Sequence, residues 1–188
     1  MPSHVPVHFG VSACLLGARV RYDARDKRQD WLLDAPAGLF RATPVCPEVD
    51  AGLGTPREPM TLVGDPTAPR LVGNDSGADH TAALASAIEA RLRAFAIDPP
   101  ELWLLKAKSP SCGVGTTPRG ALTGQDGLFA EAVARCFPGV PRVDEATLSN
   151  FRERSRIFGI LRARRCEADL ACTPLDALET WLALRFGG

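Results

Sequence analysis

The segment Glu101–Lys108 contains an uninterrupted apolar run, Leu-Trp-Leu-Leu. Such a short run without polar alternation predicts a strand covered on both faces, as in a parallel sheet between two helix layers. Earlier in the chain, apolar residues recur first with strand alternation and then at helical spacing: Val5, Val7, Phe9 and Val11, then Leu84, Ile88, Leu92 and Phe95. This order predicts an α/β fold with a mostly parallel, open, Rossmann-like sheet and flanking helices.

The alternation of strand and helix patterns continues to about residue 145 and then stops. A helix expected from Gly127 and a short strand at Arg142–Asp144 complete an α/β domain that we assign to residues 1–145. In residues 146–188 the apolar positions recur only at helical spacing, and Pro174 suits the first turn of a second helix. We therefore expect a C-terminal extension, 146–188, that forms a helical hairpin.

Six cysteines are the unusual part of an otherwise average globular composition. The first residues show no basic region and no apolar core of a signal peptide, so we expect a cytoplasmic protein. Cysteines held close together in that reducing compartment usually bind metals or act in catalysis. Because no Cys-x-x-Cys pair occurs, a zinc ribbon or finger is disfavoured. Any metal site must draw its ligands from distant positions.

Three of the cysteines, Cys14, Cys46 and Cys112, each close a predicted strand, the second of them at 43–48. Ligands of open α/β sheets bind beyond the carboxyl ends of the strands, so these thiols are expected to converge. Three thiolates match a zinc or an iron–sulfur site with one open position, and the alternative is that they are small core residues. The remaining three are not the expected ligands: Cys136 is expected in the core, and Cys166 and Cys172 lie beside a turn, where a redox pair or spare ligands are the alternative to chance placement.

Polar residues close to this trio are candidates for catalysis and substrate binding. Glu48 follows Cys46 by two residues, and Ser109 and Ser111 come just before Cys112. A carboxylate beside a metal-bound substrate serves as general base or acid, and a serine hydroxyl orients a group or relays a proton. Charged loop residues are candidates for lining the same crevice, with a solvated loop charge as the alternative for each: Arg21, Asp23, Arg57 and Lys108.

Four motifs over about residues 7–144 resemble, in order, those of the thiouracil desulfidase (TudS-like) family: Val11–Gly17 with Arg21–Asp23, Pro44–Glu48, Thr55–Pro59 and Lys108–Gly113. The resemblance implies a 4Fe–4S cluster held by Cys14, Cys46 and Cys112, with no protein ligand on the fourth iron. It implies that this iron binds the sulfur of a thiolated uracil while water replaces the sulfur, without net redox change. Glu48 would transfer the proton, with Ser109 preferred over Ser111 as the partner serine.

Ala24 departs from the family pattern, which usually has glycine after Arg-Tyr-Asp. An alanine at this position is strained if the backbone there needs a positive φ angle. We therefore expect the loop after Asp23 to differ locally from that of relatives.

The expected partner is a small thiolated pyrimidine, with 4-thiouridine in tRNA or other RNA as the alternative substrate. The segment Arg152–Arg165 is the most basic stretch and is a candidate for contacts with RNA phosphates. The alternative is that it forms an ordinary charged helix face. The formal net charge of zero disfavours a globally basic nucleic-acid binder, and no apolar run is long enough to span a membrane. Two different classes of protein are also compatible with this sequence: a non-catalytic iron–sulfur sensor or electron carrier, and a zinc-stabilised or metal-free binding module.

Overall fold

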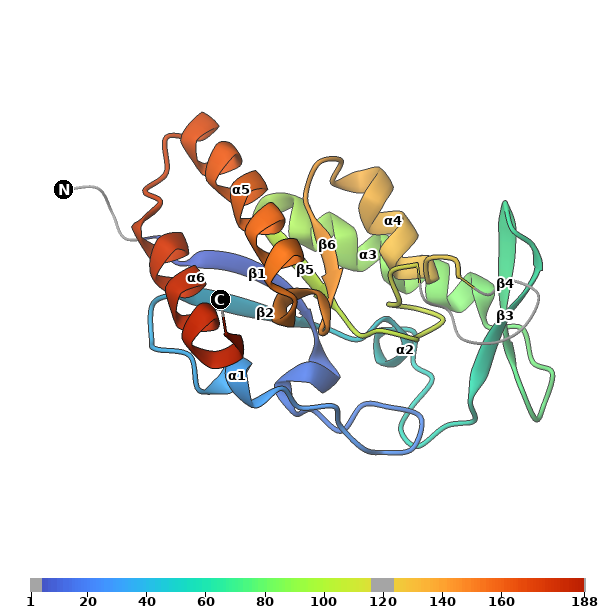
Figure 1. The fold of residues 1–188 in the computed structure, drawn as a ribbon. Coiled ribbons are helices and arrows are strands. Elements are labelled where there is room, and N and C mark those ends of the chain that lie inside the picture. Colours follow the sequence, from blue (N-terminus) through green and yellow to red (C-terminus); the bar gives the residue numbers. More distant parts are fainter. Residues whose placement is uncertain (1–4, 116–123, 188) are drawn as a thin grey trace.

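The structure is a computed structural model that describes residues 5–115 and 124–187 (Figure 1). Its main sheet has four parallel strands in the order β2-β1-β5-β6, and β3 and β4 form a separate antiparallel hairpin. The predicted α/β fold is therefore confirmed. The elements are β1 (Val7–Ser12), the 3₁₀ helix η1 (Ala13–Leu16), α1 (Asp30–Leu33), β2 (Phe40–Val45), α2 (Pro47–Asp50), β3 (Met60–Asp65), β4 (Ala68–Gly73), α3 (Thr81–Ile97), β5 (Leu102–Leu105), α4 (Leu128–Cys136), β6 (Arg142–Asp144), the 3₁₀ helix η2 (Thr147–Ser149), α5 (Phe151–Glu167) and α6 (Thr173–Phe186).

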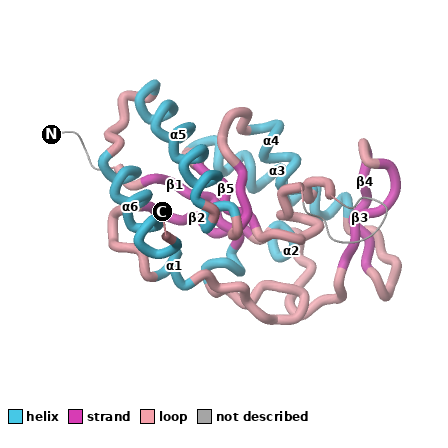
Figure 2. Tube along the Cα trace, viewed as in Figure 1, coloured by secondary structure: helices cyan, strands magenta, loops and turns pink. Residues whose placement is uncertain are grey.

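Helices cover both faces of the parallel sheet, as Figure 2 shows. Because successive strand residues point to opposite faces, β5 contributes to two separate cores. Leu102 and Leu104 lie in one core with residues of α1, α5 and α6, and Trp103 and Leu105 lie in the other with residues of α3 and α4. Gly10 of β1 makes room for the Trp103 ring, since a Cβ at this position would overlap it. The apolar run is thus buried on both sides, as predicted.

The predicted C-terminal helical hairpin is present as α5 and α6. Its apolar residues join the core on one face of the sheet: Ile157, Phe158, Leu161, Leu175, Leu178 and Leu182. The hairpin therefore packs against the sheet rather than standing apart from it. Since hairpin and sheet share this core, the boundary between two domains at residue 145 stays a prediction.

The basic segment of α5 is only partly available for contacts outside the protein. Arg154 and Arg165 are each 1% exposed. Arg154 donates to the backbone carbonyls of Leu148 and Gly187, and Arg162 pairs with carboxylates of α6. These two buried arginines are therefore unavailable to RNA, because their guanidinium groups donate to carbonyls inside the fold. An RNA contact through the rest of the segment stays a prediction.

Two further expectations differ from the structure. The strand predicted at 43–48, whose apolar residues suggest burial, is an edge strand, β2, which begins at Phe40, ends at Val45 and buries only Val45. It has one neighbour in the sheet, so most of its side chains keep contact with solvent. Cys136 is exposed, not part of the core. It is the last residue of α4, one turn beyond Ala132, where the helix is still covered.

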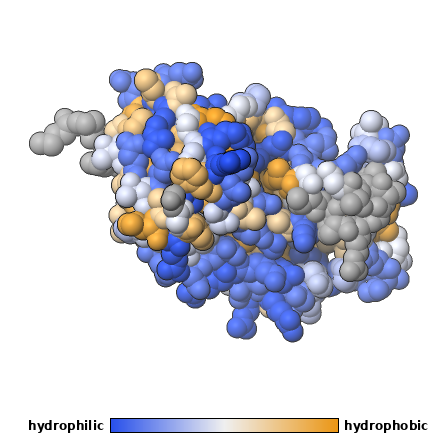
Figure 3. Space-filling model, viewed as in Figure 1, coloured by the Kyte–Doolittle hydropathy of each residue, from blue (hydrophilic) through white to orange (hydrophobic). Residues whose placement is uncertain are grey.

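The molecular surface is mixed in character. On the face seen in Figure 3, apolar residues are scattered among hydrophilic ones. Within the described part of the chain, no helix combines the length and the apolar character needed to cross a membrane. The cytoplasmic location stays a prediction.

Candidate active site

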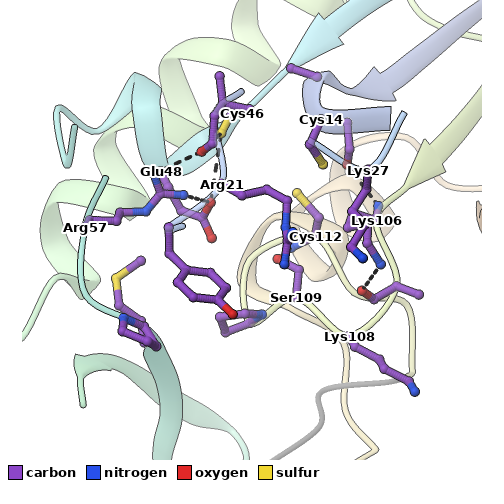
Figure 4. A pocket seen from close by; sticks show the side chains of 18 of the residues that line it. Cys14, Arg21, Lys27, Cys46, Glu48, Arg57, Lys106, Lys108, Ser109 and Cys112 are labelled. Atoms are coloured by element: carbon purple, nitrogen blue, oxygen red, sulfur yellow. Dashed lines mark hydrogen bonds and ion pairs between the residues drawn. The ribbon is translucent and has the colours of Figure 1, made fainter. Parts of the chain in front are cut away.

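Each of the three cysteines predicted as ligands lies at the carboxyl end of a parallel strand. Cys14 lies in η1 directly after β1, Cys46 lies between β2 and α2, and Cys112 lies in the loop after β5. Because β2, β1 and β5 are neighbours in the sheet, their ends bring the three thiols together. All three line one cavity of about 520 Å³, a size typical of small-molecule sites (Figure 4).

The loop that carries Cys112 is held against the N-terminus of α4. Backbone amides of residues 127–129 donate to carbonyls of residues 110–113 over 2.7–3.1 Å. These hydrogen bonds satisfy amides that have no partner within the helix. Gly127 comes so close that a Cβ there would overlap the peptide of Ser111. The absence of a side chain at Gly127 therefore allows the helix to position the cysteine loop.

Burial raises the pKa of all three thiols. It raises the pKa of Cys14 to about 12, with a further contribution from the nearby Cys46. Burial and the Glu48 carboxylate raise the pKa of Cys46 to about 11 and that of Cys112 well above its ordinary value. Thiolates at this place need a positively charged partner, and iron clusters are held by cysteine thiolates. The donor set therefore fits a metal cluster, whose binding would release the thiol protons.

The spacing of these thiols bears on the kind of metal centre. Within residues 5–115 and 124–187, no three His, Cys, Asp or Glu side chains are arranged to hold one metal ion. In Figure 4 the thiols of Cys14 and Cys112 point toward one another, and Cys46 lies across from them beside Glu48. A cluster of several irons is larger than one ion, so its ligands stand farther apart. The described residues therefore form no ready-made site for a single metal ion, and the cluster stays a prediction at this point.

Glu48 lies in the first turn of α2, and both of its carboxylate oxygens accept hydrogen bonds. Oε1 accepts from Ser111 Oγ at 2.8 Å, and Oε2 accepts from Arg57 Nη2 at 2.5 Å. Oε2 also lies 3.9 Å from Cys46 Sγ. The side chain is 15% exposed and lines the cavity. A carboxylate is thus held at the cavity wall next to an expected cluster ligand.

The two candidate serines have different surroundings. Ser109 lines the cavity, and its Oγ accepts hydrogen bonds from the amides of Ser111 and Cys112 at 3.2 and 3.1 Å. Because these amides use its two acceptor positions, the Ser109 hydroxyl is left with its proton to donate. Ser111 is 0% exposed and is not among the residues that line the cavity. Of these two candidates, Ser109 is therefore the one that a molecule in the cavity would meet.

Comparison with known proteins identifies the family of the chain. The profile of a family described as 2-thiouracil desulfurase matches residues 9–145. The chain belongs to this family. It is similar to a solved structure of the [4Fe–4S]-dependent thiouracil desulfidase TudS, with a TM-score of 0.66 and 33% identity, over 80% of this chain and 99% of that chain. It is 33% identical over 129 residues to the uncharacterized protein YbbK of Bacillus subtilis (strain 168), which covers 61% of this chain and 79% of YbbK.

The resemblance seen in the four motifs is thus confirmed, and the desulfurase profile ends shortly before the C-terminal hairpin begins.

The sequence predicts four charged residues around the cavity of this desulfurase-family protein. Three of them line it: Arg21, Arg57 and Lys108. Asp23 is not among the lining residues, and its carboxylate lies 3.2 Å from Arg21 Nη1. The Arg21 guanidinium also lies over the Tyr22 ring, 5.4 Å from its centre. The structure thus pairs Asp23 with Arg21, and a role of Asp23 in substrate binding stays a prediction.

Sequence reasoning missed several polar residues of the cavity wall, among them Lys27, Asn74 and Lys106. Lys106 directly follows β5, so the strand-end rule that identified Cys112 would also have found it. Its ammonium lies 2.5 Å from a carboxylate oxygen of Glu145. Asn74 comes from the loop after β4, and no pattern in the sequence connects this loop with the strand ends. In Figure 4, Lys27 and Lys106 lie on the Cys14 side of the cavity, opposite Glu48.

Ala24, which replaces the usual glycine of the family, has a φ angle of +54°. This is the left-handed conformation, in which the Cβ of alanine approaches the carbonyl oxygen and costs about 1–2 kcal/mol. The positive φ angle that makes an alanine strained is therefore present at this position, while a local difference of the loop from that of relatives stays a prediction. Ala24 lies in the loop that carries Arg21 and Tyr22 into the cavity wall.

Ala24→Gly is expected to raise the free energy of unfolding by about 0.5–1 kcal/mol, because relief of left-handed strain exceeds the backbone entropy that glycine adds. Urea unfolding of the two proteins measures the difference. Ala18→Gly is the matched control, since Ala18 lies in the same stretch without a positive φ, and it is expected to be destabilising. An Ala24→Gly protein less stable than the wild type would contradict the strain argument.

Proposed function

We propose that the protein removes sulfur from a thiolated uracil, 2-thiouracil, 4-thiouracil or a thiouridine, and releases sulfide with uracil or uridine. The proposal includes a 4Fe–4S cluster held by Cys14, Cys46 and Cys112, with one iron free of protein ligands. The observation that carries it is the convergence of three strand-end thiols and the Glu48 carboxylate on one cavity. Membership of the desulfurase family and similarity to a [4Fe–4S]-dependent desulfidase support it.

When bound, such a cluster supplies a Lewis acid that prefers the soft sulfur of a thiocarbonyl to the oxygen of the product. The three cysteine thiolates would place negative charge at this side of the cavity. Lys27 and Lys106, on the Cys14 side of the cavity, are placed to offset part of this charge. Lys106 is kept there by its ion pair with Glu145.

Glu48 and Ser109 are placed to move the protons. Glu48 would take a proton from the water that attacks the ring carbon, because its carboxylate lies in the cavity wall beside Cys46. Ser109, whose oxygen already accepts two amide hydrogen bonds, would donate to the pyrimidine. The carbon–sulfur double bond is replaced by a carbon–oxygen double bond, and the sulfur leaves as hydrogen sulfide. One water is consumed, and no oxidant or reductant is needed.

A non-catalytic iron–sulfur sensor or electron carrier is less consistent with this site. Such a protein has no need of a carboxylate and a hydroxyl that face an open cavity next to the cluster. The RNA alternative differs only in the size of the substrate, so it is tested together with the enzyme reaction.

The test is turnover by protein purified anaerobically, after iron and sulfide analysis and an absorption spectrum. We expect about four irons per chain and sulfide release from 2-thiouracil or 4-thiouridine. A third incubation with tRNA that contains 4-thiouridine tests the RNA alternative. Stoichiometric zinc, or no metal, would contradict the cluster. A cluster-loaded protein that turns over none of the substrates would contradict the enzyme assignment.

A further inference from the structure

The Arg57 guanidinium is engaged by protein groups although it lies at the cavity. Its Nη1 donates to the carbonyls of Val20 at 3.0 Å and Gly54 at 2.7 Å, and its Nη2 donates to Glu48 at 2.5 Å. The side chain is 7% exposed. Its Nε has no hydrogen-bond partner among the described residues, but this atom is buried, so the guanidinium has little free surface with which to bind a substrate.

Ser111 contacts the other carboxylate oxygen of Glu48, the one that Arg57 does not bind. Its hydroxyl donates to Oε1 at 2.8 Å from a fully buried position. The backbone of Ser111 is fixed in turn, because the amide of Phe129 at the start of α4 donates to its carbonyl at 2.8 Å. The helix therefore holds both Cys112 and the serine beside it, and this serine points to the carboxylate rather than to the cavity.

We propose that Arg57 and Ser111 are positioning residues that hold the Glu48 carboxylate in one orientation and do not contact the substrate. The proposal rests on the proposed desulfurase function of the same site. It changes the roles expected from the sequence, in which Arg57 binds substrate and Ser111 takes part in catalysis. Two donors on different oxygens, one of them charged, leave the carboxylate little freedom to rotate. A proton acceptor held in place before the reaction is far more effective than a mobile one.

The first measurement is steady-state kinetics of Ser111→Ala at equal iron content. We expect kcat to fall about 100-fold, as for a displacement of about 1 Å of a reacting group, with KM unchanged. Ser149→Ala is the matched control, because Ser149 is an exposed serine of η2 whose hydroxyl donates only to the carbonyl of Ala146. It should keep the wild-type kcat and KM.

The second measurement asks whether both residues act through Glu48. In a Glu48→Gln background, adding Ser111→Ala is expected to change kcat by no more than about twofold, since a residue that acts through a lost group has no further effect. Arg57→Lys should lower kcat and leave KM unchanged, because the single nitrogen of an ammonium cannot occupy the positions of both Nη1, which meets the two carbonyls, and Nη2, which meets the carboxylate. If Arg57 contacted substrate, this variant would raise KM instead.

Three outcomes would overturn the proposal: a raised KM with unchanged kcat, an equal loss of kcat in both backgrounds, or loss of iron from Ser111→Ala. A crystal structure of Ser111→Ala gives a test that does not depend on activity. We expect the Glu48 carboxylate to move or to occupy several orientations, and an unmoved carboxylate would overturn the proposal. A wild-type protein without turnover would instead overturn the proposed function, and the crystal structure would still decide the role of Ser111.

Discussion

Glu48→Gln is expected to lower kcat of the cluster-loaded protein by about 100- to 10,000-fold, the usual contribution of a general acid or base. Glutamine keeps the size of the side chain, its oxygen can accept from Arg57 and its amide nitrogen can donate to the Ser111 hydroxyl, but it cannot take a proton from water. The iron content should not change, since Glu48 is not an expected ligand. Sulfide release at saturating thiouracil, normalised to iron, measures the effect.

Asp50→Asn is the matched control for this substitution. Asp50 lies two residues further along α2, and its carboxylate binds Arg91 at 2.6 and 2.9 Å, away from the residues that line the cavity. The same change from carboxylate to amide in the same helix should therefore leave kcat near the wild-type value. Wild-type turnover by Glu48→Gln would show that another group takes the proton.

Arg165→Met is expected to lower the free energy of unfolding by about 3 kcal/mol, the lower end for removing one partner of a buried ion pair. The Arg165 side chain is fully buried and donates to both oxygens of Glu101 at 2.9 and 3.0 Å. It also donates to the carbonyls of Val5 and Ala171. Methionine fills much of the space but leaves these acceptors without a donor. Glu101 is 19% exposed, so water offsets part of the loss. Urea unfolding measures the change.

Arg162→Met, one turn earlier in α5, is the control for this effect. Arg162 pairs with Asp176 and Glu179 of the hairpin and is 39% exposed, so its loss should cost no more than about 1 kcal/mol. If Arg165→Met does not fold, Glu101→Gln provides a milder loss of the same ion pair. Equal stability of the Arg165→Met and Arg162→Met proteins would contradict the anchoring role of Arg165.

Much of the fold and the cysteine trio could be predicted because their signals are local. The run Leu102–Leu105 indicates a strand buried on both faces, and the turn-forming residues after each strand mark its end. The strand-end rule then brings Cys14, Cys46 and Cys112 to one edge of the sheet. The same rule would have found Lys106, which follows β5 directly.

The roles of the side chains around the trio could not be predicted in this way. Arg57, a charged loop residue, is expected at the substrate from the sequence, yet its two terminal nitrogens are engaged by Val20, Gly54 and Glu48. Arg165 belongs to the most basic stretch of the chain, yet it is fully buried. The residue type determines which interactions a side chain can make. It does not determine which partner the fold brings within reach.

The sequence by itself determined the parallel sheet, the helical C-terminal hairpin and the cysteines at the strand ends, because periodicity and turn residues act over a few neighbouring positions. Only the tertiary structure decided which hydroxyl faces the cavity and which one holds Glu48. Ser109 and Ser111 are two residues apart in one loop, and their roles differ because α4, α2 and the Arg57 loop pack around that loop from different sides. Contacts between segments distant in sequence depend on packing of the whole chain, which no local pattern encodes.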